Sequence, residues 1–229
     1  HFICFLFKNW KGVVNRISPE APVPIFEQKT NEMKAGGAAN VTMNIKSLGS
    51  SVALVGMLGT DDEGYQIQQL LDNNGILTKY ILKNNTKPTS VKTRIMANHQ
   101  HLLRIDRENR LPIDNELLQS LINSIHLCIN EFNPQVCIIQ DYEKGLLTRD
   151  SIPVILSLLR ELNIPVLVDP KNKNFWLYTG VALFKPNIRE LRAAMQSEIL
   201  INLESLHKAS THLFQKIGID NVLLTLGEH

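Results

Sequence analysis

The feature that most constrains the fold of this chain is a regular alternation of short apolar runs with segments of helical periodicity. Helical spacing of apolar residues, often ended by glycine, predicts helices at 38–48, 61–75, 116–129, 151–162, 188–195 and 204–217. Apolar runs of strand length lie at 51–56, 136–139, 166–168, 181–184 and 221–225. Apolar strands separated by helices predict an α/β fold with a mostly parallel sheet and helices on both faces.

Two segments break this alternation and predict a small β-lid beside the sheet. Residues 16–30 contain three prolines and cannot form a helix, while residues 89–106 carry β-type residues around a polar turn at 98–101. We place the lid at about 12–32 and 88–107. The apolar run Phe2 to Phe7 predicts a short buried strand, because it is far too short to span a bilayer.

Length and charge favour a small-molecule enzyme built as one domain. A chain of 229 residues with 44% hydrophobic residues has enough apolar surface for a core, so we treat 1–229 as a single domain. The net charge of +2 and the absence of long runs of like charge give no reason to expect nucleic acid or a membrane as partner. Three scattered cysteines predict a reducing, cytoplasmic location.

A pair of glycines, Gly36 and Gly37, precedes the first predicted helix in the stretch AGGAANVTMN. Without β-carbons they would let a ligand lie against the backbone, and the free N–H groups of the helix start suit a polyol or an anion. Asn40 lies in the first turn. The alternative is a simple glycine helix start with Asn40 as a surface residue, and the stretch alone favours that alternative.

Charged residues follow three predicted strands at the edge where parallel sheets bind ligands. Asp141 and Lys144, in the segment DYEKG, follow the first strand, and the pair Asp169 and Lys171 follows the second. A polar loop after a strand is common, so a structural role for DYEKG is an equal alternative.

The third strand is followed by Lys185, Asn187 and Glu190. Asn187 and Glu190 have the spacing of a helix capping box, which alone would explain both residues. Their oxygens would also suit Mg²⁺, bound indirectly through water beside a phosphate.

Three residues of the predicted lid, His99, His101 and Arg104, have side chains of types that can bind a ligand. His99 and His101 lack the further ligands that a zinc site requires, so we do not expect a metal there. Arg104 could reach over the cleft and bind a phosphate with its guanidinium group, although a solvated strand arginine is an equal alternative.

Eight segments together resemble a known family: RISPEAPVP, GGAANVTMNIKSLG, LVGMLGTDDEG, LLRID, DYEKG, DPKNKNFWLYTG, LFKPNIRE and LLTLGEH, which extend over 16–229. The chain resembles the ribokinase-like, phosphofructokinase-B-type carbohydrate kinases. Within them it is most similar to the heptose-7-phosphate kinase domain of bacterial ADP-heptose synthesis. The resemblance implies transfer of the ATP γ-phosphate to O1 of D-glycero-D-manno-heptose 7-phosphate, for lipopolysaccharide precursor synthesis.

The same resemblance implies a role for each candidate residue, with ATP and Mg²⁺ as cofactors. The sugar phosphate would contact Gly36, Gly37, Asn40, Arg104, Asp141 and Lys144. The nucleotide would contact Lys185, Asn187, Glu190, Thr225 and Gly227, with Glu190 also reaching Mg²⁺ through water. Exposed lid edges predict a homodimer through the β-lid.

The chain departs from the family pattern at two places. The family begins with a strand ending in GD, followed by an aspartate that holds sugar hydroxyls, and neither acid is present in HFICFLFKNW. The later GAGD segment, which supplies the catalytic base, does not occur before His229. We therefore expect a kinase domain incomplete at both ends and nearly inactive alone. The alternatives are a kinase for a fructose-type or ribose-type sugar, and a non-catalytic binding or dimerisation module.

Overall fold

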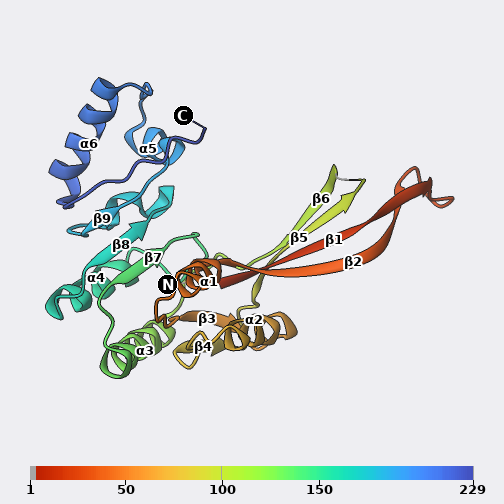
Figure 1. Ribbon diagram of the computed structural model, residues 1–229, viewed down its shortest axis with the longest axis horizontal. Coiled ribbons are helices and arrows are strands. Elements are labelled where there is room, and N and C mark those ends of the chain that lie inside the picture. The colour runs from red at the N-terminus through yellow and green to blue at the C-terminus, as the bar shows by residue number, and fades with distance from the viewer. Residues whose placement is uncertain (1–3, 99, 229) are drawn as a thin grey trace. The chain divides into compact units, whose positions relative to one another are not determined.

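The computed structural model describes residues 4–98 and 100–228, which divide into two compact units (Figure 1). The N-terminal unit is Cys4–Asn109, and the C-terminal unit contains 110–228. Within these described residues, no helix combines the length and the apolar character needed to cross a membrane.

A four-stranded sheet forms the lid of the N-terminal unit, in the order β2-β1-β5-β6 (Figure 1). Its strands are β1 (Cys4–Ile17), β2 (Pro24–Gly37), β5 (Ser90–Ala97) and β6 (Gln100–Arg107). β1 pairs antiparallel with β2 and parallel with β5, and β5 pairs antiparallel with β6. The segments 12–32 and 88–107 predicted for the lid both contribute to this sheet; β1 and β2 extend beyond the first segment, whereas β5 and β6 lie within the second. The described part of the run at 2–7 is the start of β1 rather than a separate strand.

The remainder of the N-terminal unit contains two helices and a two-stranded parallel sheet. These elements are α1 (Ala38–Ser47), β3 (Gly56–Gly59), α2 (Asp62–Asn73) and β4 (Ile81–Asn84). The strand predicted at 51–56 is displaced, because only Ala53 in its middle bridges to Leu77 and the paired strand begins at Gly56. The core joins these elements to the base of β1 through Leu6, Leu54, Leu58, Ile67 and Leu71.

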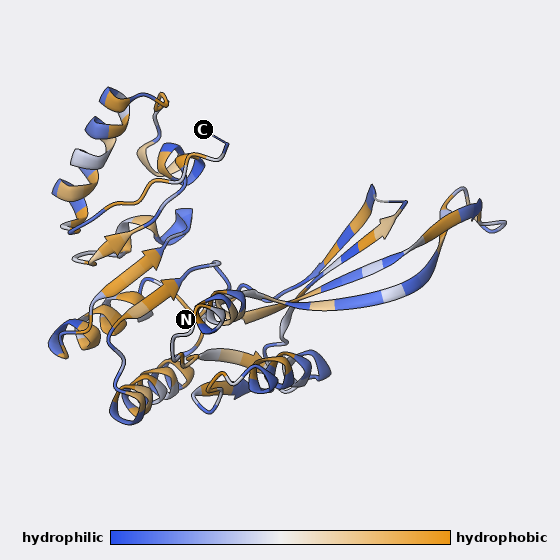
Figure 2. Ribbon diagram, in the orientation of Figure 1, coloured by the Kyte–Doolittle hydropathy of each residue, from blue (hydrophilic) through white to orange (hydrophobic). Residues whose placement is uncertain are grey.

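The C-terminal unit is built on a three-stranded parallel sheet with the order β7-β8-β9. In chain order its elements are α3 (Asn115–Phe132), β7 (Cys137–Gln140), α4 (Ser151–Glu161), β8 (Val166–Asp169), the 3₁₀ helix η1 (Asn172–Leu177), β9 (Leu183–Phe184), α5 (Ile188–Met195) and α6 (Leu203–Ile217). Figure 2 shows that β7 and β8 are mainly hydrophobic, and each ends in a polar residue, Gln140 or Asp169.

The strand predicted at 221–225 is present only as two isolated parallel bridges, Phe184 to Val222 and Asn187 to Thr225. Parallel pairing (β1–β5, β3–β4, β7–β8 and β8–β9) exceeds antiparallel pairing (β1–β2 and β5–β6) among the described strands. The predicted mixed α/β class with mostly parallel pairing is therefore confirmed, although the hydrogen-bonded strands belong to three sheets instead of one.

Ion pairs connect the base of the lid to the start of α2. Glu63 accepts hydrogen bonds from Lys8 Nζ at 2.9 Å and from Arg107 Nη2 at 2.6 Å. Arg107 also reaches Asp61, the N-cap of α2, at 3.2 Å. Burial raises the pKa of Glu63, but the bonds from Lys8 and Arg107 lower it more, to about 2. The carboxylate thus stabilises the junction of β1, β6 and α2 only while it is ionised.

We expect Glu63→Gln to lower the free energy of unfolding at pH 7 by about 1 kcal/mol, the scale of a partly screened ion pair. The folded-state pKa lies below the ordinary value of 4.5, so this stabilisation is present above pH 4.5 and is lost as the pH falls toward 2. Urea unfolding at pH 7 and at pH 3 should show a smaller difference for Glu63→Gln than for wild type. Glu20→Gln, in an exposed turn, is the matched control. Equal pH dependence in Glu63→Gln and wild type would contradict this assignment.

Candidate functional site

The two glycines have structural reasons that involve no ligand. Gly36 lies opposite Phe5 in the β1–β2 pair, and a β-carbon on Gly36 would approach the Phe5 ring to 2.2 Å. Gly37 is the N-cap of α1 with φ 60°, a backbone conformation that strains other residues. Gly37 has no side chain with which to cap α1, and the N–H of Ala39 in the first turn interacts with the Cys4 thiol. A ligand at this helix start would use the remaining N–H groups of the first turn.

The side chains of Asn40 and Arg104 differ in whether they already contact another side chain of the protein. Asn40 is exposed on the first turn of α1, and no side-chain hydrogen bond is found for it among the described residues. Arg104 lies on β6 with Nε at 3.0 Å from Oδ1 of Asp106. A ligand anion at Arg104 would have to compete with this carboxylate.

Asp141 is fully buried. Its side chain accepts hydrogen bonds from Asn174, which lies in η1, and from Tyr178, the residue after η1. Its Oδ2 accepts hydrogen bonds from Asn174 Nδ2 at 2.9 Å and from the Tyr178 hydroxyl at 2.8 Å. Its Oδ1 accepts one from the backbone N–H of Glu143 at 2.8 Å. Burial raises the pKa of Asp141, and these donors offset only part of the rise. The carboxylate therefore connects the end of β7 to the segment after β8.

The DYEKG loop is held in an unusual backbone shape. Glu143 has φ 53° and Gly145 has φ 82°, both in the left-handed region. The Glu143 side chain accepts a hydrogen bond from the backbone N–H of Lys173 at 2.8 Å, which joins the loop to η1. Lys144 is 9% exposed, so most of its side chain is enclosed by the protein.

Charged side chains gather where β8 and β9 end. Lys185 Nζ lies 2.8 Å from Asp169 Oδ2, and Lys171 Nζ contacts Glu190 Oε1. The Lys171 ammonium also lies 5.9 Å from the centre of the Tyr142 ring. Burial lowers the pKa of Lys171, but the hydrogen bond that Lys171 donates to Glu190 raises it more, and the net shift is upward. Two lysine–carboxylate pairs thus lie at the ends of adjacent strands.

Asn187 and Glu190 form the capping box that their spacing predicted. The Asn187 side chain accepts a hydrogen bond from the backbone N–H of Glu190, and Glu190 Oε2 accepts one from the backbone N–H of Asn187, both at 2.9 Å. This exchange explains why α5 begins at Ile188. The two side chains therefore cap α5, and any contact with a ligand would be in addition to this structural role.

A cavity of about 650 Å³ brings together three of the five residues predicted to bind the nucleotide: Asn187, Thr225 and Gly227. Thr225 is held beside Asn187 because its carbonyl accepts a hydrogen bond from the N–H of Ile188 at 3.0 Å. Lys185 and Glu190 lie next to this segment but do not line the cavity. Its other lining residues are Ile188, Arg189, Arg192, Ile201, Leu226 and Glu228.

A second cavity, of about 690 Å³, lies in the same unit between the end of α5 and α6. Trp176, His212 and Lys216 line one side of it, with Lys216 Nζ 3.7 Å from the centre of the Trp176 ring. None of the residues predicted from the sequence lines this cavity.

Sequence reasoning missed several residues that surround the predicted ones. Arg189 and Arg192 line the cavity at Asn187, and Arg189 could have been found because it lies inside the NIRE segment. Asn174 and Tyr178 could not, because they lie in the aromatic run NFWLY, whose composition indicates only packing. The sequence pairs Lys171 with Asp169, but in the structure the partner of Lys171 is Glu190, which is 19 residues away.

The donor set at this edge fits only an indirectly bound magnesium ion. Among residues 4–98 and 100–228, no group of three histidine, cysteine or acidic side chains is arranged to hold a metal. Asp169 and Glu190 are the nearby carboxylates, and each is paired with a lysine. Such a set suits Mg²⁺ that keeps its waters and is held mainly by phosphates. Of the two lid histidines, His101 lies on β6, and His99 lies outside the described residues.

Comparison with known proteins finds a matching family and relatives with similar sequences. The family model described as "pfkB family carbohydrate kinase" matches residues 9–229. The bifunctional protein HldE of Pelobacter propionicus is 39% identical over 218 residues, covering 95% of this chain and 44% of that protein. The bifunctional protein HldE of Haemophilus influenzae is 36% identical over 223 residues, with 97% and 45% covered. The chain thus spans less than half the length of these relatives.

Solved structures share the fold at low sequence identity. The phosphofructokinase-2 of Escherichia coli in complex with fructose-6-phosphate superposes with a TM-score of 0.78 at 16% identity, covering 99% of this chain and 72% of that one. The ribokinase of Arabidopsis thaliana complexed with ribose and ATP gives 0.70 at 18% identity, with 99% and 70% covered. These likenesses confirm the ribokinase-like fold predicted from the sequence. Together with the family match over 9–229, they establish that the chain belongs to the pfkB family of carbohydrate kinases.

Proposed function

We propose that this chain is the kinase domain that transfers the ATP γ-phosphate to O1 of D-glycero-D-manno-heptose 7-phosphate. The observation that carries the proposal is the cavity at the start of α5, where Asn187, Thr225 and Gly227 meet beside a cluster of lysines. The choice of sugar rests on the resemblance of the DYEKG and RISPEAPVP segments to heptose kinases, and on the similarity to the HldE proteins.

The nucleotide would occupy the C-terminal unit. The cavity of about 650 Å³ has the volume of a ligand site, and Arg189 on its wall is exposed. Lys185 and Lys171 supply positive charge at the neighbouring strand ends. Phosphoryl transfer depends mainly on positioning and charge neutralisation, which these cations would provide. Bound Mg²⁺ would add a further charge on the phosphate oxygens, with Glu190 reaching it through water.

The sugar would contact the N-terminal unit through the start of α1. The uncapped N–H groups after Gly36 and Gly37 would donate to its hydroxyls, and the exposed amide of Asn40 would do the same. Arg104 would pair with its anionic end by exchanging Asp106 for the phosphate. Lys144 would also face the anionic end.

Asp141 is better explained as a positioning residue than as a direct sugar ligand. Both of its oxygens already accept hydrogen bonds from Glu143, Asn174 and Tyr178. In this role Asp141 would keep the DYEKG loop in the shape that the glutamate and glycine with positive φ require. Its substitution would then act on sugar binding only through the loop.

The first experiment measures binding, because binding tests the ligand assignment separately from turnover. Calorimetry should detect heptose 7-phosphate and an ATP analogue, and it should detect fructose 6-phosphate and ribose more weakly. Asn40→Ala should weaken heptose 7-phosphate binding about fivefold, the value of one hydrogen bond, without changing the unfolding midpoint. The midpoint should stay because the Asn40 side chain is exposed and makes no recorded hydrogen bond among the described residues.

Three outcomes would reject parts of this proposal. Preference for an unphosphorylated hexose or for ribose would replace the heptose assignment with another sugar kinase. Binding of neither sugar phosphate nor nucleotide would favour a non-catalytic assembly module. Rapid ADP release by the chain alone would show that the expected inactivity is wrong.

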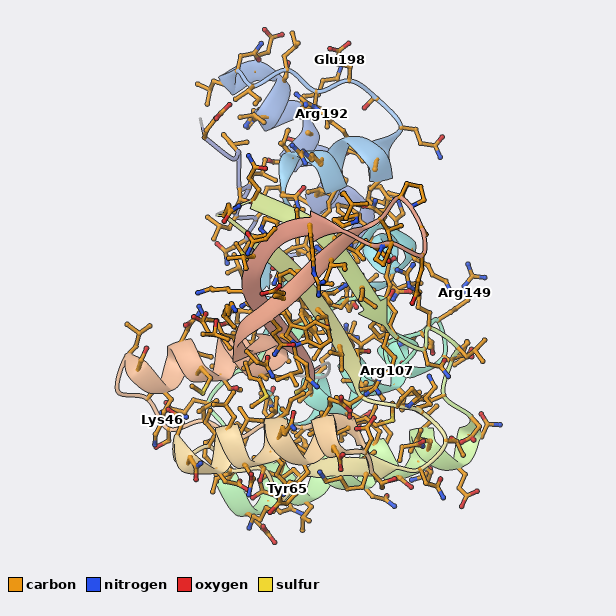
Figure 3. All side chains as sticks on the ribbon, turned by 90° about the vertical axis from the view of Figure 1, so that its right-hand side faces the viewer. Lys46, Tyr65, Arg107, Arg149, Arg192 and Glu198 are labelled. Carbon is orange, nitrogen blue, oxygen red and sulfur yellow. The ribbon has the colours of Figure 1, made fainter. Side chains whose placement is uncertain are left out.

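The proposed nucleotide site can be tested separately by substituting Arg189. Arg189→Met should weaken binding of the ATP analogue about tenfold, because a hydrogen bond to a charged phosphate is lost. Arg149→Met is the matched control, since Arg149 is an exposed arginine of the same unit that points outward (Figure 3) and lines neither cavity. Equal affinities of the two variants would remove the cavity from the nucleotide site.

We further propose that the lid mediates a homodimer. β2 and β6 are the edge strands of the lid sheet, and every described position of β6 is exposed. Leu103 and Ile105, on one face of β6, are 55% and 47% exposed. An exposed strand edge with apolar side chains is a surface that pairs readily with a second copy.

Light scattering should therefore give a dimer for wild type and a monomer for Ile105→Glu. Placing like charges across a two-fold contact should raise the dissociation constant about a hundredfold or more. Leu203→Glu, which changes an exposed leucine of the C-terminal unit in the same way, should remain dimeric. A monomeric wild type, or a dimeric Ile105→Glu variant, would contradict the lid interface.

A further inference from the structure

Both carboxylate oxygens of Glu190 contact donor groups of the protein. Oε1 contacts the Lys171 ammonium, and Oε2 accepts the backbone N–H of Asn187 at 2.9 Å. The residue is 6% exposed, so these donors, rather than water, neutralise most of its charge. The capping-box bond is needed to start α5. The bond to Lys171 is the one that can be exchanged.

The second carboxylate of this edge is neutralised in the same manner. Asp169 pairs with Lys185 at 2.8 Å; Asp169 is the last residue of β8, and Lys171 lies two residues after it. The two carboxylates and two lysines have a net charge of zero. A divalent cation arriving alone would meet two ammonium groups and would have to displace at least one of them.

We propose that Lys171 acts as a resident counter-cation of Glu190 that excludes free divalent cations until nucleotide binds. Lys171 is a positioning residue here, because it acts on the metal through Glu190. When a nucleotide carries its cation to this edge, the phosphates would supply a new anionic partner for the ammonium, and Glu190 would become free to bind the hydrated cation. The metal would therefore arrive as the nucleotide complex and not before it.

The proposal rests on the proposed function, because it assigns the Lys171–Glu190 pair to a site for magnesium and nucleotide. Its physical basis is general: removing one member of a poorly solvated ion pair leaves an uncompensated charge, which attracts another ion of the missing sign. The chain offers a close control. Lys173 lies two residues further along in η1, is exposed, and forms no ion pair among the described residues.

The test measures Mn²⁺ binding to the whole chain in the absence of nucleotide, by electron paramagnetic resonance of the free ion. Lys171→Met should bind Mn²⁺ about tenfold more tightly than wild type, the scale of one charge pair weakened by solvent. Lys173→Met removes the same charge from the same segment and should bind within about twofold of wild type. Mn²⁺ affinity of Lys171→Met no higher than that of Lys173→Met would overturn the proposal.

Lys171→Gln keeps the test valid if Lys171→Met does not fold, as circular dichroism would show. The glutamine amide can still donate to Glu190 but carries no charge, so Lys171→Gln should also bind Mn²⁺ more tightly than Lys173→Met. Failure of this result is distinct from failure of the proposed function. The Mn²⁺ measurement uses no sugar and no nucleotide, whereas the kinase assignment depends on binding both.

Discussion

The parallel register of β7, β8 and β9 is the constraint on which the chemistry of the C-terminal unit depends. Gln140 pairs with Asp169, and Val168 pairs with Phe184, so the three strands end at nearly the same level. A charged residue follows within two positions of the end of each strand. The chain therefore delivers Asp141, Lys171 and Lys185 to one edge without any long-range signal in the sequence, because parallel strands share the direction of their carboxyl ends.

Structural and functional requirements coincide in several residues of this protein. Gly37 takes the positive φ that begins α1, and the N–H groups that follow it are those proposed to bind the sugar. Asn187 and Glu190 cap α5, and Asn187 also lines the cavity of about 650 Å³. Such coincidence follows from helix geometry, since the groups that start a helix also present N–H donors to an anion. Loss of stability and loss of binding must therefore be measured separately for these residues.

Prediction from the sequence succeeded where a local pattern decides the structure. The helices at 188–195 and 204–217 have apolar spacing and polar caps, and both were predicted within one residue of their bounds. It failed at 51–56 and 221–225, because an apolar run shows that a segment is buried but not which neighbour pairs with it. It also failed for the partners of Asp141, since Asn174 and Tyr178 are more than 30 residues away.

The sequence by itself determined the α/β class and the charged segments after the strands, because these depend on short-range spacing, and the resemblance of its motifs indicated the family. Only the tertiary structure decided which of those charges are already satisfied. Asp141 became a buried acceptor and Glu190 became the partner of Lys171 because hydrogen bonds and ion pairs form between side chains brought together by packing. A sequence places a charge along the chain, but its partner depends on distances in space.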